Sequence, residues 1–345
     1  MLDALKIETE RLARSWMQHE PAKLRDYLVA GVEDPRINLQ SILSRHFLVR
    51  AVFGKKFRAL MEQECRFAAA MNWLIALAAN SEAQELDALI HALRRGADNV
   101  EGLEIPRFIL ATFASLPLSF DSLIIPNYIE TYLERATLQG ESLDTFQCIW
   151  RESLADENVP QGQAISILEP ACGSANDYRF LHSFGIARFL DYSGIDLCAK
   201  NIENARELFC AFRSPTGMPA LPVHFDVGNV FEIDAPDHGF ELSFVHDLFE
   251  HLSIEGLDAA VSELCRVTRR AICANFFQMD EIPDHMIRPT DEYYWNLLSM
   301  DQMKRLFATH GFTSQVIRVK SFLRQEFGCD YTHNAKAYTL ILRHT

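Results

Sequence analysis

The feature that most constrains the fold is the alternation of short apolar runs with helical patterns after residue 163. Short strands separated by helices predict a mostly parallel sheet that is covered by helices on both faces. No clear helical pattern separates the last two runs, so we expect an antiparallel hairpin at one edge. The predicted fold class is therefore α/β, a doubly wound, mostly parallel seven-stranded sheet with an antiparallel terminal hairpin. The predicted strands are 164–169, 189–196, 223–227, 241–246, 270–276, 315–319 and 337–342, and the predicted helices are 177–184, 199–212, 254–267 and 300–309.

The first 150 residues follow a different, almost entirely helical rhythm. Apolar residues at helical spacing predict helices at 40–48, 57–79 and 128–136. The polar stretch 156–163, which contains a proline and a glycine, is typical of a linker. We therefore predict an all-α domain at 1–155, acting as a cap or in oligomerisation, and a sheet domain at 160–345.

Charge and composition exclude several classes of protein. The net charge of −14 argues against a protein that wraps nucleic acid or docks on an anionic membrane. The longest apolar run, 67–79, is too short to cross a bilayer and predicts a buried helix. No apolar leader follows Met1, and the eight cysteines form no C-x-x-C pair, so we expect reduced thiols in a cytoplasmic protein.

The ends of the first two predicted strands carry the strongest functional signal. Ligands in such sheets bind outside the carboxyl ends of the strands. The first strand ends in Glu169-Pro-Ala-Cys-Gly-Ser-Ala-Asn, an acid and small residues before a helix, which is typical of a nucleotide-binding turn. A tight strand–helix turn without a ligand would look similar. The second strand ends in Asp196, where an acid commonly accepts hydrogen bonds from ribose hydroxyls, although an aspartate that caps a helix is the alternative.

Residues 160–345 resemble the class I S-adenosylmethionine-dependent methyltransferases. That family begins with a hydrophobic residue, an acid and the pattern x-Gly-x-Gly-x-Gly. Here Gly173 keeps the central glycine, whereas Ala171 and Ala175 replace the first and third. The segments Glu250-His-Leu and Glu263-Leu-Cys-Arg-Val also resemble the family in the expected order. The resemblance implies S-adenosylmethionine as the cofactor, bound by Glu169, Ala171, Gly173, Asp196, Leu197, Asn229, Val230 and His246.

Two of these assignments leave alternatives open. The family usually has an aspartate for the adenine at the third strand, and Asn229 stands in that frame, with Val230 placed to pack on the ring. Asp226 is the rival candidate, three residues earlier. His246 is predicted both to lie beside the cofactor and to accept a proton, because the pKa of histidine suits that role. The alternative for His246 is a purely supporting hydrogen bond.

The remaining candidates concern the acceptor and its deprotonation. Asp247 and His251 are predicted to be catalytic together with His246, although the two could simply pair with each other. Arg288, Tyr293, Tyr294 and Trp295 are expected to line the acceptor pocket, where such residues lie in the family. Packing or a hinge is the alternative. The acidic loop 280–285 could hold a cation together with Asp247, but a solvated loop is the favoured interpretation, so no metal is predicted.

The predicted function is methylation of a small organic acceptor on oxygen or nitrogen. The predicted partners are that acceptor and, through the helical part, a second copy of the chain in a homodimer. Neither nucleic acid nor membrane is expected. Two alternatives come from other classes. One is a protein-modifying enzyme that recognises its partner through the helical part, and the other is a non-catalytic S-adenosylmethionine-binding or scaffold protein.

Overall fold

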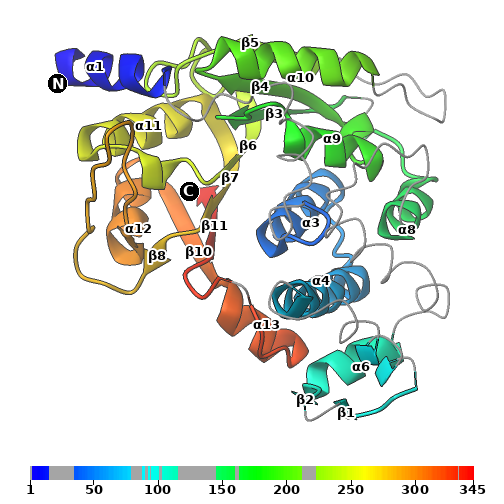
Figure 1. The fold of residues 1–345 in the computed structure, drawn as a ribbon. Helices are drawn as coiled ribbons and strands as arrows, with labels where there is room; N and C mark the ends of the chain where they lie inside the picture. Colours follow the sequence, from blue (N-terminus) through cyan, green and yellow to red (C-terminus); the bar gives the residue numbers. More distant parts are fainter. Residues whose placement is uncertain are drawn as a thin grey trace.

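A seven-stranded sheet forms the centre of the molecule (Figure 1). The computed structural model describes residues 2–14, 35–78, 88–89, 92–93, 95–100, 103–115, 145–159, 163–211, 223–332 and 334–345. The strand order is β10-β11-β7-β6-β3-β4-β5, in which only β11 runs antiparallel to its neighbours. This confirms the predicted fold class. The strands are β3 (Ile165–Pro170), β4 (Leu190–Asp196), β5 (Val223–Val227), β6 (Phe240–His246), β7 (Thr268–Phe276), β10 (Phe312–Arg318) and β11 (Tyr338–His344).

The terminal hairpin differs from the prediction in one respect. The helix α13 (Val319–Phe327) connects β10 to β11, where no helix was expected. Its buried residues Val319, Leu323 and Phe327 recur every four positions, which is the spacing of one helical face. The predicted strand 315–319 includes Val319, which is the first residue of this helix. The apolar residues on both sides of the junction between β10 and α13 were therefore assigned to one strand.

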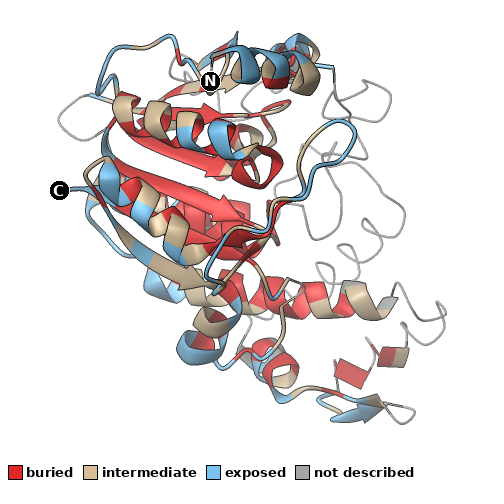
Figure 2. Cartoon of the chain, turned by 90° about the vertical axis from the view of Figure 1, so that its left-hand side faces the viewer, coloured by how far each residue is buried: buried red, intermediate tan, exposed pale blue. Residues whose placement is uncertain are grey.

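Helices cover both faces of the sheet, as the alternation of strand residues requires. On β6, Leu242 and Phe244 belong to one apolar cluster, and Val245 belongs to the other. The first cluster includes residues of α9 (Asn176–Ser183) and α10 (Ala199–Ala211). The second includes residues of α11 (Ile254–Val267) and α12 (Met300–Thr309). Figure 2 shows the resulting layer of buried strands between partly exposed helices.

The N-terminal helices pack directly on the sheet. The helix α3 (Leu39–Phe53) contacts β7 and β11, and α4 (Arg58–Ala78) packs behind it (Figure 1). The first apolar cluster contains residues from both sides of the predicted boundary at 155–160, so one core spans the two parts, and that boundary stays a prediction. The other described N-terminal elements are α1 (Leu2–Leu12), α6 (Arg107–Ser115), α8 (Thr145–Leu154) and a short hairpin of β1 (Asn99–Val100) and β2 (Leu103–Glu104) that was not expected. The helix predicted at 128–136 lies outside the described residues, and among the described ones no helix is long and apolar enough to cross a membrane.

A buried ionic network joins three of these helices. The carboxylate of Glu64 on α4 accepts hydrogen bonds from Arg45 on α3 at 3.0 Å and from the Trp150 indole on α8 at 3.0 Å. Its second oxygen lies 2.6 Å from Nε2 of His46. Burial raises the pKa of Glu64, but Arg45 and His46 outweigh burial and leave the pKa below its ordinary value. Because both oxygens are engaged, this buried charge is fully compensated.

Candidate functional site

The site lies where the strand order reverses, between β3 and β6. From β3 the chain forms β4 and then β5 on one side of β3, and it then crosses to the other side of β3 to form β6. In open sheets of this kind the crevice outside the carboxyl ends of the two central strands binds ligands. The turn after Pro170 and the residues after His246 therefore lie at the same edge of the sheet.

The turn after β3 keeps the backbone of a glycine-rich loop although it holds one glycine. Ala171, Gly173 and Ala175 all have left-handed backbones, with φ of 55°, 56° and 61°. Left-handed backbone is typical of glycine, and each alanine there stores about 1–2 kcal/mol of strain. The turn is held to the next strand by the amide of Cys172, which donates to the carbonyl of Ile195 at 3.0 Å. No side chain at these three positions is larger than a methyl group, so a ligand can approach the backbone closely.

Asp196 lies against this turn, as its place at the end of β4 predicts. Its carboxylate accepts from the amide of Gly173 at 3.0 Å, from the amide of Cys198 at 2.8 Å and from the side chain of Asn201 at 3.2 Å. Burial raises the pKa of Asp196, and these three donors partly offset that rise. The bond to Cys198 spans two residues and closes a local turn just before α10, which begins at Ala199. The bond to Gly173 also fixes the carboxylate beside the turn. Leu197, which follows it, is half-buried.

Glu169 points into the core at the end of β3. The hydroxyl of Tyr192 donates to its carboxyl group, which is almost completely buried. Burial, together with the nearby Asp177, raises the pKa of Glu169 well above its ordinary value. Burial therefore disfavours the charged form of Glu169, and its side chain, bonded to Tyr192, supports the turn.

Asn229 and Val230 lie at the end of β5, next to the N-terminal helix α1. The side-chain oxygen of Asn229 accepts from the amide of Phe231 at 2.9 Å, and its nitrogen donates to the hydroxyl of Thr9 at 3.2 Å. Val230 is half-buried. The rival residue, Asp226, is exposed and pairs with Arg206 at 3.0 Å. Of the two candidates, Asn229 contacts the N-terminal helix α1, whereas Asp226 contacts α10.

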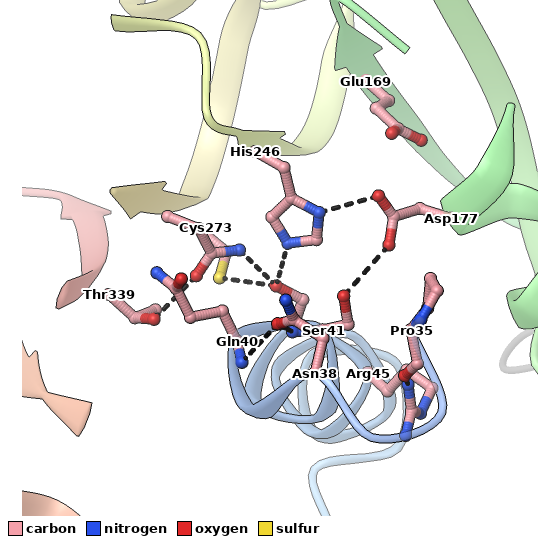
Figure 3. A network of polar contacts seen from close by, with 12 residues as sticks. Pro35, Asn38, Gln40, Ser41, Arg45, Glu169, Asp177, His246, Cys273 and Thr339 are labelled. Carbon is pink, nitrogen blue, oxygen red and sulfur yellow. Dashed lines mark hydrogen bonds and ion pairs between the residues drawn. The ribbon is translucent and has the colours of Figure 1, made fainter. Parts of the chain in front are cut away.

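The two ring nitrogens of His246 have different partners, one of which is the carboxylate of Asp177 (Figure 3). Nδ1 of His246 donates to Asp177 at 2.7 Å, and Nε2 lies 3.1 Å from the hydroxyl of Ser44 on α3. Burial lowers the pKa of His246, but the attraction of Asp177 and the hydrogen bond to it overcome burial and raise the pKa to about 9. The ring is therefore an imidazolium at neutral pH, and in that state it has no lone pair with which to accept a proton.

Sequence reasoning did not identify the other members of this network. Asn275 on β7 donates to the hydroxyl of Ser44 at 2.8 Å, and Thr339 on β11 donates to Asn275 at 2.6 Å. Nearby, Gln40 on α3 donates to the carbonyls of Phe276 and Tyr338. The one available signal was the run of polar residues at the start of an otherwise apolar helix, because buried polar side chains need partners.

Asp247 and Glu250 follow directly after β6. Asp247 has a left-handed backbone, with φ of 49°, which is uncommon for a residue other than glycine and turns the chain sharply at the strand end. Glu250 is fully buried and accepts from the amide of Gln278 at 3.2 Å through one oxygen. Its other oxygen has no hydrogen-bond partner among the described residues. Burial and the charge of Asp247 raise the pKa of Glu250 to about 8.

His251 is held by the segment 286–297, which we call the strap. Nδ1 of His251 donates to the carbonyl of Tyr294 at 3.1 Å, and the amide of Tyr294 donates back to the carbonyl of His251 at 3.3 Å. Burial lowers the pKa of His251, so the ring is neutral at neutral pH. Because a carbonyl can only accept, Nδ1 carries the proton, and Nε2 keeps the lone pair of the neutral ring.

Aromatic rings gather around His251. The rings of Phe277, Tyr293 and Trp295 lie with their centroids 5.4–5.5 Å from that of His251. Trp295 is 37% exposed, so the group, which we call the aromatic cluster, opens to solvent at one side. The ring of Tyr294 instead stacks under Arg11 of α1 at 4.9 Å, and Arg288 is exposed. Of the four predicted acceptor residues, Tyr293 and Trp295 therefore belong to the aromatic cluster.

The acidic loop forms local contacts. His285 accepts from the amide of Ser299 at 2.9 Å, and Asp284 accepts from Gln302 at 2.7 Å. Among the described residues, no group of three histidine, cysteine, aspartate or glutamate side chains is arranged to hold a metal ion. Asp284 and His285 are therefore bonded to residues at the start of α12.

Comparison with known proteins gives one family match. Residues 167–271 match a family model described as a methyltransferase domain. No curated protein matches the sequence. Among solved structures, a protein described as a SAM-dependent methyltransferase from Methanosarcina mazei is 13% identical with a TM-score of 0.40, and the match covers 52% of this chain and 92% of that chain. Magnesium protoporphyrin IX methyltransferase from Synechocystis with bound SAH is 11% identical with a TM-score of 0.38, covering 58% and 82%. A 1,6-didemethyltoxoflavin-N1-methyltransferase from Burkholderia thailandensis is 13% identical with a TM-score of 0.39, covering 70% and 93%.

Proposed function

The chain carries a class I S-adenosylmethionine-dependent methyltransferase domain, and on this premise we propose that it is an enzyme that methylates a small organic acceptor on oxygen or nitrogen. The observation that carries the proposal is the bond between Asp196 and the amide of Gly173. This bond holds the carboxylate of Asp196, at the end of β4, against the left-handed turn that follows β3. A carboxylate in that place accepts hydrogen bonds from a ribose diol, and the turn leaves room for the rest of the cofactor.

Several of the cofactor assignments have a physical basis in the fold. Ala171, Gly173 and Ala175 provide the close backbone approach, and Asp196 accepts from the ribose hydroxyls. Asn229 and Val230 lie at the end of the next strand, where an adenine ring would be enclosed. Glu169 supports the turn through Tyr192 and does not present a free carboxylate.

The aromatic cluster supports a planar, uncharged acceptor. Phe277, Tyr293 and Trp295 provide ring faces, and aromatic rings stack favourably in offset or edge-to-face arrangements. The strap that carries two of these rings is tied to the end of β6 because the amide of Asn296 donates to the carbonyl of Glu250 at 2.9 Å. Its aromatic residues therefore stay close to the reacting end of the sheet.

The two histidines suit different tasks because their surroundings move their pKa values apart. The cofactor supplies an activated methyl group, so the protein has to align the acceptor, exclude water and remove a proton where the acceptor carries one. His251 is neutral, keeps a lone pair on Nε2 and lies within the aromatic cluster, so we assign it as the proton acceptor. His246 is an imidazolium, and we assign it and Asp247 to shaping the strand end.

Calorimetry with S-adenosylmethionine tests the cofactor assignment. Asp196→Ala should weaken binding by about 1–3 kcal/mol, roughly 5- to 150-fold, because a buried hydrogen-bonding carboxylate is lost. Asp226→Ala is the matched control, since that acid ends the neighbouring strand but points to Arg206 in solvent, and its affinity should not change. Absence of binding to the unaltered protein would overturn the proposal. Binding without methyl transfer to small molecules or to proteins would favour the non-catalytic alternative.

A further inference from the structure

We propose that Ser44 and Asp177 are positioning residues that fix the ring of His246, so that the N-terminal helix α3 contributes to the active end of the sheet. This inference rests on the proposed function and deepens it. His246 is 17% exposed and ends the central strand β6, at the point where the strand order reverses. Its two ring nitrogens are bonded to residues from two different helices, one on each side of the ring.

The hydrogen-bond directions show how Ser44 is held. Thr339 donates to the side-chain oxygen of Asn275, which leaves the amide nitrogen of Asn275 pointing at Ser44. The hydroxyl of Ser44 therefore accepts one bond from Asn275 and has one more lone pair and one proton to offer. It can accept from the imidazolium of His246 while its own proton points to the sulfur of Cys273, 3.5 Å away. Ser44 thus has partners for all of its hydrogen-bonding positions when His246 is charged.

Asp177 provides the charge that keeps the imidazolium stable. It lies in the first turn of α9, directly after the turn that follows β3. Ser41 of α3 donates to its second oxygen at 3.4 Å. The other charged or titratable groups that face His246 are Glu169 on β3 and Asp247 after β6, and both favour the charged ring. The thiol of Cys273 on β7 contacts the same hydroxyl of Ser44 that contacts His246.

The division of work between the two positioning residues follows from these contacts. Asp177 sets the charge of His246, because it is the nearest opposite charge. Ser44 sets the orientation, because it is the partner of Nε2 and is itself fixed through Asn275 and Thr339. The charged, oriented ring cannot compete with His251 for the acceptor's proton. The N-terminal part of the chain is therefore needed for the geometry of the site as well as for its packing.

Histidine side-chain NMR on the full-length, ligand-free protein tests this assignment, with the signals of His246 identified by their loss in His246→Gln. In the unaltered protein His246 should titrate near pH 9 and show an Nε2–H proton protected from exchange with water. Asp177→Asn should lower the midpoint to below about 7, since burial then acts without its partner. Ser44→Ala should leave the ring charged at pH 7 but abolish the protection of Nε2–H, and Ser44→Cys should retain part of it.

Ser243→Ala is the matched control. Ser243 is a buried serine on the same strand, and it bonds to Thr268 at 2.6 Å, away from His246. Its removal should leave both the midpoint and the protection of His246 unchanged. A protected Nε2–H in Ser44→Ala, or a charged ring at pH 7 in Asp177→Asn, would overturn the inference. Calorimetry with S-adenosylmethionine on the same samples separates this result from a failure of the proposed function, because cofactor binding does not enter the NMR measurement.

Discussion

The left-handed alanines of the turn after β3, which we call the cofactor turn, give the sharpest test of the backbone geometry. Ala175 has φ of 61°, is only 5% exposed and precedes the first residue of α9. Ala175→Gly removes about 1–2 kcal/mol of left-handed strain. It also gives the unfolded chain more freedom, at a cost of about 0.4–1 kcal/mol, and loses a buried methyl group worth about 0.8 kcal/mol. These effects nearly cancel, so the free energy of unfolding should change by less than about 1 kcal/mol.

The same chemical change in an ordinary helix gives the comparison. Ala260 lies in the middle of α11 and is fully buried. Ala260→Gly loses the helix preference of alanine, about 1 kcal/mol, together with the buried methyl group, so it should lower the free energy of unfolding by about 2 kcal/mol. Urea unfolding at pH 7 measures the free energy of unfolding of both variants. We expect Ala260→Gly to lose about 1–2 kcal/mol more than Ala175→Gly.

Ala171→Gly extends the test. Ala171 is only half-buried, so less packing is lost and the variant should be at least as stable as the unaltered protein. Calorimetry should show that neither turn variant binds S-adenosylmethionine more weakly, because glycine keeps the same backbone. A loss of 2 kcal/mol in Ala175→Gly, equal to that of the helix control, would show that the turn is not left-handed and would refute this reasoning.

The sheet could be predicted from the sequence because its signals are local. The strands are five to nine residues long, each contains several apolar residues, and most are separated from the next helix by turn residues. The order of strands and helices then limits the topology to few choices. The helix α13 was missed because its first turn continues the apolar pattern of β10, and periodicity alone does not separate the two over so short a stretch.

The site could be predicted only in part, for a related reason. Gly173 and Asp196 end neighbouring parallel strands, so the rule that ligands bind at strand ends brings them together. Ser44 and His246 are 202 positions apart, and no such rule joins a helix of the N-terminal part to the end of β6. The polar side chains of α3 indicated that something lay opposite them, but tertiary packing alone decides what that is.

Two further predictions concern buried carboxyl groups with opposite behaviour. Glu64→Gln should lower the free energy of unfolding by roughly 3–5 kcal/mol, because Arg45 is left buried without its partner, whereas Glu62→Gln on the exposed side of α4 should cost less than about 1 kcal/mol in the same urea assay. The lowered pKa of Glu64 means that its stabilising contribution is present above pH 4.5 and lost as the pH falls through the folded-state value. Glu250→Gln should instead stabilise the protein. Between its unfolded pKa of 4.5 and its folded pKa of about 8, the unfolded chain releases a proton that the folded chain retains, so stability falls as pH rises. Glutamine is free of this penalty, and we expect a gain of roughly 3 kcal/mol at pH 7 that vanishes near pH 4. Equal pH slopes for the variant and the unaltered protein would show that Glu250 is ionised in the fold.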